Sequence, residues 1–451
     1  MAYSYAAPPQ NFDGTTILTI YICLLLAIPS PMVVAPLGSA GAPSAIMAFG
    51  AFFLWAWFQI QRNRQSNWGP QPVRAAALGW LLVMLIVYAH AMSMPIPGDE
   101  ISPADNGLLK LVGFTGVLLV ANDGVPSLER HRTLLRRLVI GGGLIALLGL
   151  LQYATKQLFV DHMQIPGLTQ GTASWGLIER SGHPRPSGTS THPIEYGVVL
   201  TMVLPIAITY ALKSPTRRWV YRGFLCAIAF AVFLSISRSA LICACVALVV
   251  LAASWTTAVR LRALVALIVI AVVVYISVPG VLGATTGLFT RAADDPSVAS
   301  RTGSYDLAAE FVSRSPIVGR GFGTFLPKYW ILDNGYLGML IEGGIVGLAG
   351  LLILLVVAAV AARKARRLAV DDFDRDLAQA LLAALAAGAS ALALFDTFGF
   401  PQSAGCFFLI LGMAGGMRRL AMAHLQSSAQ SGGIAVSQTS APIPARNGEK
   451  P

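Results

Sequence analysis

The feature that most constrains this chain is a series of apolar runs, most of which approach the ~20 residues that an α-helix needs to cross a bilayer. Such runs lie near 15–34, 42–60, 75–94, 107–121, 138–155, 194–212, 219–236, 239–254, 262–281, 335–361, 378–395 and 402–417. Of the 451 residues, 55% are hydrophobic and only 12% are charged, which leaves little polar sequence for a soluble domain. The sequence therefore predicts an all-α polytopic membrane protein with about 12 transmembrane helices.

Basic residues predict how this bundle is oriented. They gather in every second connection, within 62–74, 130–137, 213–222, 260–262, 363–375 and 418–419. Because cytoplasmic loops carry an excess of Lys and Arg, this alternation places both termini in the cytoplasm. The net charge of +11 then reflects topology, and we do not interpret it as a nucleic-acid surface. The five cysteines lie within apolar runs, which argues against a disulfide framework.

The same pattern divides the chain into six parts. Residues 1–155 hold helices 1–5, 156–193 a first large outer loop, 194–282 helices 6–9, 283–334 a second large outer loop, 335–420 helices 10–12, and 421–451 a tail. The tail is rich in Ser, Gln, Gly and Pro, and we expect it to be disordered and cytoplasmic. Within the second loop, residues 297–313 predict an amphipathic helix, which Pro316 would end. The residues expected to share one side of it are Val298, Arg301, Tyr305, Ala308, Ala309 and Val312.

Arginine on the outer side is unexpected and needs a reason. The outer basic residues are Lys156, Arg180, Arg185, Arg238, Arg291, Arg301, Arg314, Arg320 and Lys328. They could pair with acids of the same loops or with lipid phosphates, or their guanidinium groups could hold the phosphate oxygens of an anionic ligand. For most of them pairing is the simpler interpretation. Arg238 favours the ligand, because the turn over 235–240 is too short to hold a partner acid.

Two polar residues stand where the tenth helix begins. Asp333 either caps the helix or serves as a general base at the lipid surface, and Asn334 beside it could be the cap instead. Glu342 lies about two turns further along, where an unpaired charge is costly, so we expect it to be protonated or paired with an arginine. His162, His183 and His192 match no standard set of metal ligands and are interpreted as flexible loop residues.

With these residues in view, the chain resembles the O-antigen ligase and polysaccharide polymerase superfamily of bacterial envelope glycosyltransferases. The resemblance rests on RPSGTSTHPIEYG before the sixth helix, SRSA at 237–240, and SPIVGRGFGTF followed by DNGYLGMLIEGGIVGL. It implies a multi-pass protein of the bacterial cytoplasmic (inner) membrane that uses a polyprenyl-pyrophosphate-linked glycan on the periplasmic side, with no metal and no other cofactor. It also implies that Arg185, Arg238 and Arg301 hold the pyrophosphate.

Together, the residues and the resemblance predict an enzyme of polysaccharide biosynthesis that moves glycan from the lipid donor to an acceptor hydroxyl. We expect Asp333 and Arg238 to be catalytic. The residues expected to bind substrate are Arg185, Arg301, Arg320, Tyr305 and Glu342. Ligases that attach glycan to lipid A core typically have histidine where this chain has Asp333. This departure favours a surface or exopolysaccharide polymerase over an O-antigen ligase.

Two other classes of protein remain open. A lipid-linked or solute transporter usually places ionisable residues near the middle of the membrane, whereas here they gather at the ends of the predicted helices. An inactive relative could act as a scaffold in an envelope assembly. The partners expected for the enzyme are the lipid-linked donor, a glycan or lipid acceptor and membrane lipids, with envelope-assembly proteins as further candidates and no nucleic acid.

Overall fold

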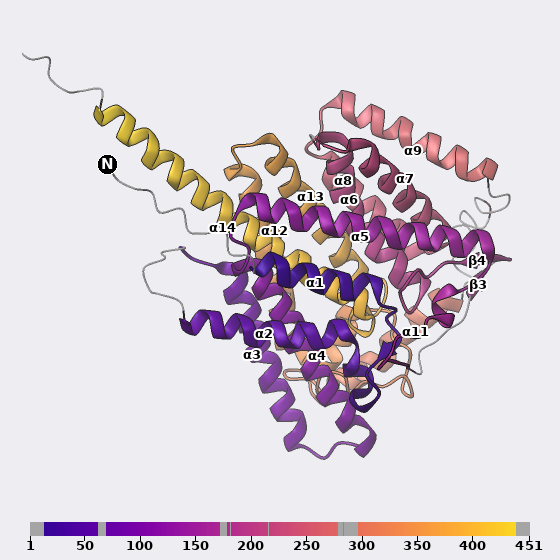
Figure 1. Ribbon diagram of the computed structural model, residues 1–451. Helices are drawn as coiled ribbons and strands as arrows, with labels where there is room; N and C mark the ends of the chain where they lie inside the picture. Colours follow the sequence, from indigo (N-terminus) through magenta and orange to yellow (C-terminus); the bar gives the residue numbers. More distant parts are fainter. Residues whose placement is uncertain are drawn as a thin grey trace, which may run out of the picture.

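The computed structural model describes residues 13–61, 69–171, 178–180, 182–214, 216–277, 283 and 296–438. They form a bundle of long helices with short strands and turns at one end (Figure 1). The helices are α1 Gly14–Ala27, α2 Pro43–Gln61, α3 Pro72–Ser93, α4 Gly98–Asp123, α5 Leu128–Thr155, α6 Pro193–Lys213, α7 Arg218–Leu234, α8 Arg238–Ala252, α9 Thr257–Ser277, α11 Pro296–Arg314, α12 Gly335–Leu368, α13 Asp372–Leu392 and α14 Pro401–Gln438. The smaller elements are β1 Met32–Val33, η1 Ala35–Gly41, η2 Phe159–His162, β2 Thr169–Gln170, β3 Ile178–Arg180, β4 His183–Arg185 and η4 Thr397–Gly399.

The mostly helical membrane architecture is confirmed. A helix lies at each of the predicted runs, and among the described residues 7 helices are long and apolar enough to cross a bilayer: α2 to α6, α12 and α14. Helices α1 and α8 are apolar but have only 14 and 15 residues. At 1.5 Å per residue they span about 21–23 Å, less than the ~30 Å hydrocarbon core. The exact number of crossings stays a prediction.

Helices α6 and α14 form the centre of the bundle. In each, 89% of the most apolar stretch is buried within the protein. Glycines bring α14 close to α4: a Cβ added at Gly412 would lie 2.3 Å from the backbone oxygen of Leu118, and one at Gly416 would lie 2.6 Å from that of Ala121. Small residues at such contacts allow two helix backbones to pack closely in a membrane. The position of α4 is therefore fixed by α14.

One end of the bundle, which we call the loop end, carries residues 28–42, 94–97, 156–171, 178–192, 235–237, 315–334 and 393–400. Contacts between distant parts of the chain tie this end together. Strand β1 pairs with β2 antiparallel, and β3 pairs with β4. The amide of Ser30 donates to the carbonyl of Thr189 (2.9 Å), and Gln402 donates to both Leu25 and Thr189 (2.9 Å each). These bonds hold the long first loop against the starts of several helices.

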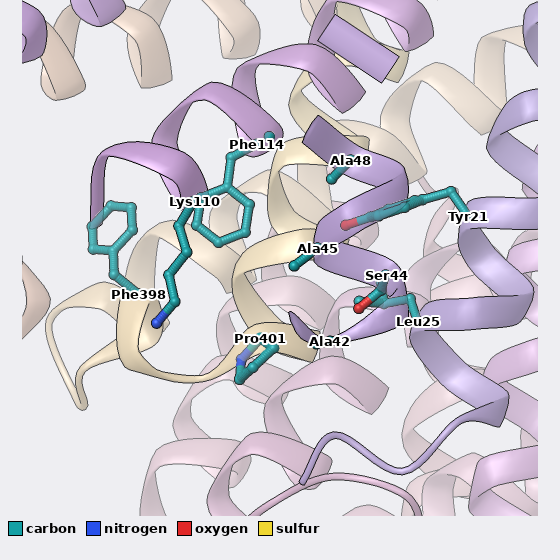
Figure 2. A pocket seen from close by; sticks show the side chains of 11 residues that line it. Tyr21, Leu25, Ala42, Ser44, Ala45, Ala48, Lys110, Phe114, Phe398 and Pro401 are labelled. Atoms are coloured by element: carbon teal, nitrogen blue, oxygen red, sulfur yellow. The ribbon is translucent and has the colours of Figure 1, made fainter. Parts of the chain in front are cut away.

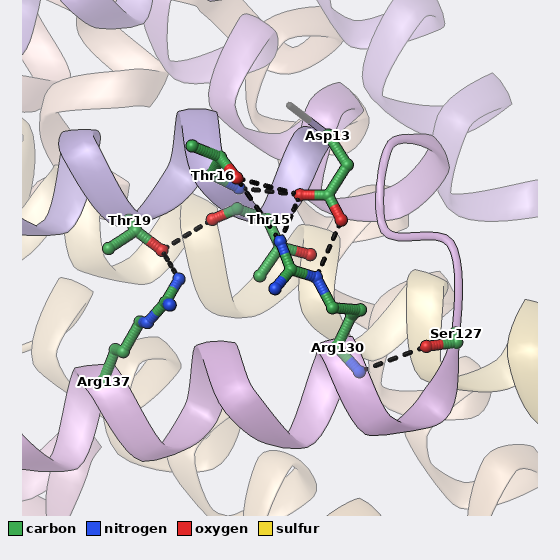
Figure 3. Close-up of polar contacts among 7 residues, drawn as sticks. All are labelled: Asp13, Thr15, Thr16, Thr19, Ser127, Arg130 and Arg137. Atoms are coloured by element: carbon green, nitrogen blue, oxygen red, sulfur yellow. Dashed lines mark hydrogen bonds and ion pairs between the residues drawn. The ribbon is translucent and has the colours of Figure 1, made fainter. Parts of the chain in front are cut away.

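The opposite end, which we call the basic end, carries residues 124–127, 214–217, 253–256 and 369–371. Its basic side chains meet acids from other helices. Arg130 donates to both carboxylate oxygens of Asp13 at 2.7 Å, and Asp13 in turn caps α1 by accepting from Thr16 (Figure 3). Arg132 binds Asp374 at 2.6 Å, and Lys213 binds Asp376 at 2.5 Å. The side chains that indicate topology in the sequence also connect the helices.

Two expectations need correction. Helix α11 is present and ends at Arg314, but its buried side is formed by Ser304 (3% exposed), Ala308 and Phe311, whereas Tyr305 is 55% exposed. The packing face is rotated because α11 packs on α12, where Ile341 joins the cluster of Ala308 and Phe311. Helix α14 continues to Gln438, although we expected disorder from residue 421. Residues 420–426 are mostly good helix formers, so the helix extends beyond the apolar run.

Candidate functional site

Arg185 reaches the turn between α7 and α8, from which α8 begins at Arg238. The Nε of Arg185 donates to the backbone carbonyl of Ser235 at 2.8 Å, and Arg238 is the first residue of α8 three positions later. Both are buried, at 5% and 8% exposure. Arg185 reaches the turn from β4, which pairs with β3 in the first large loop. The structure thus places the side chain of Arg185 at the turn that precedes Arg238, 53 positions later in the sequence.

The turn that presents Arg238 is conformationally strained. Ile236 has φ 44°, in the left-handed region that a β-branched side chain rarely adopts, and it is fully buried. Ser237 follows it and caps α8 by accepting from the amide of Ala240. Residues held in such a conformation cost of order 1–3 kcal/mol and persist where the surroundings fix them. The strained turn fixes the direction in which α8 begins, and with it the place of Arg238.

Arg185 carries a buried positive charge with unused hydrogen-bonding capacity. Within the described residues, its Nη2 is buried without a hydrogen-bond partner. Burial, and to a smaller extent the charge of Arg180, lower the pKa of Arg185 to about 10, so the guanidinium remains cationic at neutral pH. A buried cation without a carboxylate is costly. The arrangement suits an anion that would supply the missing negative charge.

His192 lies beside Arg185 and corrects another expectation. We expected a flexible loop histidine, but His192 is the N-cap of α6, where its Nδ1 accepts from the amide of Ile194 at 3.1 Å. Its ring lies 6.1 Å from that of Phe400. Burial, with the nearby charge of Arg185, lowers the pKa of His192 to about 4. Its imidazole is therefore neutral at neutral pH, so His192 adds no positive charge beside Arg185.

The segment 393–400, between α13 and α14, was not identified from the sequence. On one side, the Oγ of Ser239 donates to the carbonyl of Leu394 at 3.4 Å, next to Arg238. On the other side, burial raises the pKa of Asp396, and the negative charge of Asp333 raises it further. Lys110 of α4 extends toward this segment and lines a cavity with Phe398 and Pro401 (Figure 2). The positive charge of Lys110 lowers the pKa of Asp396 and so opposes part of the rise that burial and Asp333 cause.

Asp333 is not the cap of α12. The Oδ1 of Asn334 accepts from the amides of Tyr336 and Leu337, each at 3.1 Å, so Asn334 caps the helix. Asp333 is half-buried at the loop end, near Asp396. The segment 393–396 thus connects two groups: the start of α8 next to Arg238, through Leu394, and the carboxyl groups of Asp333 and Asp396. Asp396 could have been suspected from its place before a helix-starting proline, but nothing local in the sequence connects it to Asp333.

Arg320 and Glu342 have structural partners. Arg320 donates to both oxygens of Glu100 at 2.8 and 2.6 Å and lies over the rings of Phe311 and Tyr329. Glu342 accepts from the backbone amide of Phe325 at 3.0 Å, and the expectation that it is protonated or paired with an arginine stays a prediction. Together these contacts hold the 319–325 segment between α4 and α12. A role for either residue in substrate binding stays a prediction.

The other predicted residues lie further from this arrangement or beyond what is described. Arg301 lies in the second turn of α11, and its side chain is outside the described part of the structure. Tyr305, on the same helix, is exposed and has no place in the buried cluster with α12. Among the described residues no group of three or more His, Cys, Asp or Glu side chains could hold a metal ion.

The comparison with protein families identifies the middle of the chain. Residues 223–352 match the model of the family described as O-antigen ligase. The matched range runs from α7 into α12 and includes Arg238, Arg320, Asp333 and Glu342, while Arg185 and Asp396 lie outside it. No curated protein matched the chain. This match confirms the resemblance seen in the sequence, because residues 223–352 are similar to the O-antigen ligase family.

Proposed function

We propose that this protein is a polysaccharide polymerase of the bacterial inner membrane, which moves glycan from a polyprenyl-pyrophosphate donor to an acceptor hydroxyl at the loop end. The observation that carries the proposal is Arg185, a buried cation without a carboxylate that is hydrogen-bonded to the turn presenting Arg238. A pyrophosphate leaving group would supply the negative charge that Arg185 lacks among the described residues. Guanidinium groups bind phosphate oxygens through paired N–H donors, which a point charge would not reproduce.

The reaction needs two contributions from the protein: stabilisation of the leaving group and a base that accepts the proton of the acceptor hydroxyl. The acceptor oxygen attacks the anomeric carbon of the donor sugar, the bond from that carbon to the pyrophosphate oxygen breaks, and the electron pair leaves with the pyrophosphate. Arg185 and Arg238 stabilise that departing charge, and losing one such preorganised group commonly costs ~10²–10³ in rate. The acceptor hydroxyl must also lose its proton, for which Asp333 is the proposed base.

The proposed roles of the remaining residues follow from where they lie. Arg301 completes the set of pyrophosphate ligands, and Tyr305 contacts the glycan from the exposed side of α11. Arg320 and Glu342 keep the 319–325 segment in place beneath the donor. The donor and the acceptor are the proposed partners, and no metal takes part in the proposed reaction.

The choice of Asp333 as base is supported by its neighbours. Because Asn334 already caps α12, Asp333 is not needed for that purpose. The resemblance implies histidine at this position in ligases that act on lipid A core, so aspartate here favours transfer to a growing glycan. The concentration of Lys and Arg in the connections of the basic end supports the proposed orientation, in which that end and both termini are cytoplasmic.

The experiment compares two neighbouring substitutions in purified full-length protein supplied with a polyprenyl-pyrophosphate-linked glycan. Asp333→Asn keeps the size of the side chain but removes the proton acceptor, so we expect polymer formation to fall ~10²–10⁴-fold with an unchanged melting temperature. Asn334→Ala removes the cap, so it should lower stability by about 1 kcal/mol while activity of the folded protein persists.

Product analysis by mass spectrometry separates the alternatives. Chains containing several donor units support the polymerase. Transfer of one glycan to added lipid A core, without extension of the donor chains, would assign the protein as a ligase. A stable Asp333→Asn variant with full activity would remove this residue from the chemistry and leave the two arginines as the proposed catalytic groups.

A further inference from the structure

A large apolar groove runs between α9 and the bundle, away from the arginine site. It is bounded by α6, α7, α8 and α9 and encloses about 1160 Å³. Small-molecule sites usually occupy ~300–1,000 Å³, so this space suits a larger ligand. Its walls are mainly aliphatic, with Leu204, Ile208, Leu225, Leu248 and Ala266 among them. Helix α9 lies along the outside of the bundle in Figure 1.

The polar groups of the groove gather at one end of it. The lining residues near the basic end are Lys213, Ser254, Trp255, Thr256, Arg262 and Asp376. Toward the loop end the lining consists of apolar side chains such as Phe233, Leu241 and Ile270. A ligand that matches this distribution has a polar head at the basic end and long apolar chains that extend toward the loop end.

The polar end of the groove is positive. Lys213 is paired with Asp376 at 2.5 Å, so these two charges compensate each other. Arg260 donates to the carbonyls of Ala252 and Ala253 at the end of α8. Arg262 is exposed and, within the described residues, makes neither a hydrogen bond nor an ion pair. Helix α9 begins at Thr257, which adds the positive end of its dipole to the same place.

We propose that this groove binds an anionic glycerophospholipid, with its acyl chains along the groove and its phosphate at Arg262, next to Trp255 and the start of α9. Basic pockets between transmembrane helices at the cytoplasmic surface are suited to anionic lipid headgroups, and tryptophan is enriched at that depth. The polyprenyl donor fits less well, because its pyrophosphate would have to lie at the basic end, opposite Arg185 and Arg238. The bound lipid holds α9 against α7 and α8.

The test uses delipidated full-length protein in detergent, to which phosphatidylglycerol or phosphatidylcholine is added as mixed micelles. We expect phosphatidylglycerol to raise the melting temperature by about 2–4 °C and phosphatidylcholine to raise it by much less. Arg262→Gln should remove most of the difference between the two lipids. Arg363→Gln is the matched control, since Arg363 is also exposed near the cytoplasmic end of α12 and does not line the groove.

A second variant tests the groove without changing a charge. Ala266→Phe projects a ring into the lining, so native mass spectrometry should show less phosphatidylglycerol retained than in the wild type. Equal stabilisation by both lipids, an unchanged lipid preference in Arg262→Gln, or the same effect from inorganic phosphate would overturn the proposal. Equal stabilisation by a polyprenyl phosphate through Arg262 would also overturn it. None of these measurements depends on the transferase reaction.

Discussion

The two ends of the bundle use arginine in different ways. At the basic end, Arg130 and Arg132 reach aspartates on other helices, at 2.7 and 2.6 Å, and these ion pairs connect α5 to α1 and α13 (Figure 3 shows the first). At the loop end, Arg185 reaches a backbone carbonyl, and the structure gives it no carboxylate among the described residues. A paired cation joins helices, whereas a buried cation without a carboxylate leaves room for an anionic ligand.

The loop end also contains an arginine that is paired with a carboxylate, as at the basic end, which makes the contrast with Arg185 sharper. Arg320 is bound to Glu100 through two contacts and is covered by two rings. Arg185 and Arg320 both lie at the same end of the protein and are both largely buried, yet only one of them is neutralised by the protein. Position relative to the membrane therefore does not decide the role of an arginine, and its partners do.

The first prediction concerns Arg185 and has the largest expected effect. Arg185→Gln should lower glycan transfer by ~10²–10³-fold, because a charge that stabilises the leaving group is lost. The melting temperature should stay the same or rise, since the change removes a buried cation that the protein leaves uncompensated. Both quantities are measured on the same purified sample. Arg314→Gln, at an exposed arginine paired with Glu310, is the control and should leave activity unchanged.

A fall in stability that parallels the fall in activity would break the contrast, because it would show that Arg185 supports the fold as the arginines of the basic end do.

The second prediction concerns the basic end. Arg132→Gln leaves Asp374 buried, at 4% side-chain exposure, without its cation. Removing one partner of a buried pair costs about 3–5 kcal/mol, and since the side chain of Arg132 is 34% exposed we expect about 2–3 kcal/mol here. The loss is measured as a lower melting temperature in detergent. Activity per folded molecule should remain close to that of the wild type.

Adding Asp374→Asn to Arg132→Gln should recover part of the lost stability, because it removes the charge that has lost its partner. If the double variant is as unstable as the sum of the two single variants, the two side chains do not interact, and the ion pair does not stabilise the bundle.

Hydropathy and charge were enough to place the helices, because both are local properties of the sequence. Each apolar run became a helix, and the basic loops lie at one end, where their partners are also found. Arg238 was also recognised, since it stands in a short turn between two predicted helices, whereas Arg185 was named only through the resemblance. The resemblance then connected two positions that hydropathy alone could not bring together.

The parts that could not be predicted depend on contacts between distant residues. The buried side of α11 is set by α12, so Ser304 is buried and Tyr305 exposed although their own sequence suggested otherwise. Arg320 is neutralised by an acid 220 positions away. The pKa of Asp396 is raised by burial and by the charge of Asp333, 63 positions earlier in the chain. No periodicity along the chain contains this information.

The last prediction has the smallest effect and follows from His192. Its pKa is lowered from 6.5 to about 4 by burial and by Arg185, so the folded protein binds fewer protons than the unfolded chain between these values. The stability that depends on the neutral imidazole is complete above pH 6.5 and is lost as the pH falls toward 4. At ~1.36 kcal/mol per unit, about 1–2 kcal/mol should be lost by pH 5.

His192→Asn should reduce this loss, because asparagine can accept from the amide of Ile194 as the N-cap but does not titrate. The measurement is the melting temperature between pH 7 and pH 5, with His162→Asn, at an exposed histidine of η2, as the control. Inorganic pyrophosphate should also reduce the wild-type loss, since an anion at Arg185 would favour the protonated imidazole beside it. A pH dependence that is unchanged in His192→Asn would show that the loop end accommodates a second cation without cost, and the contrast with the basic end would then rest on Arg185 alone.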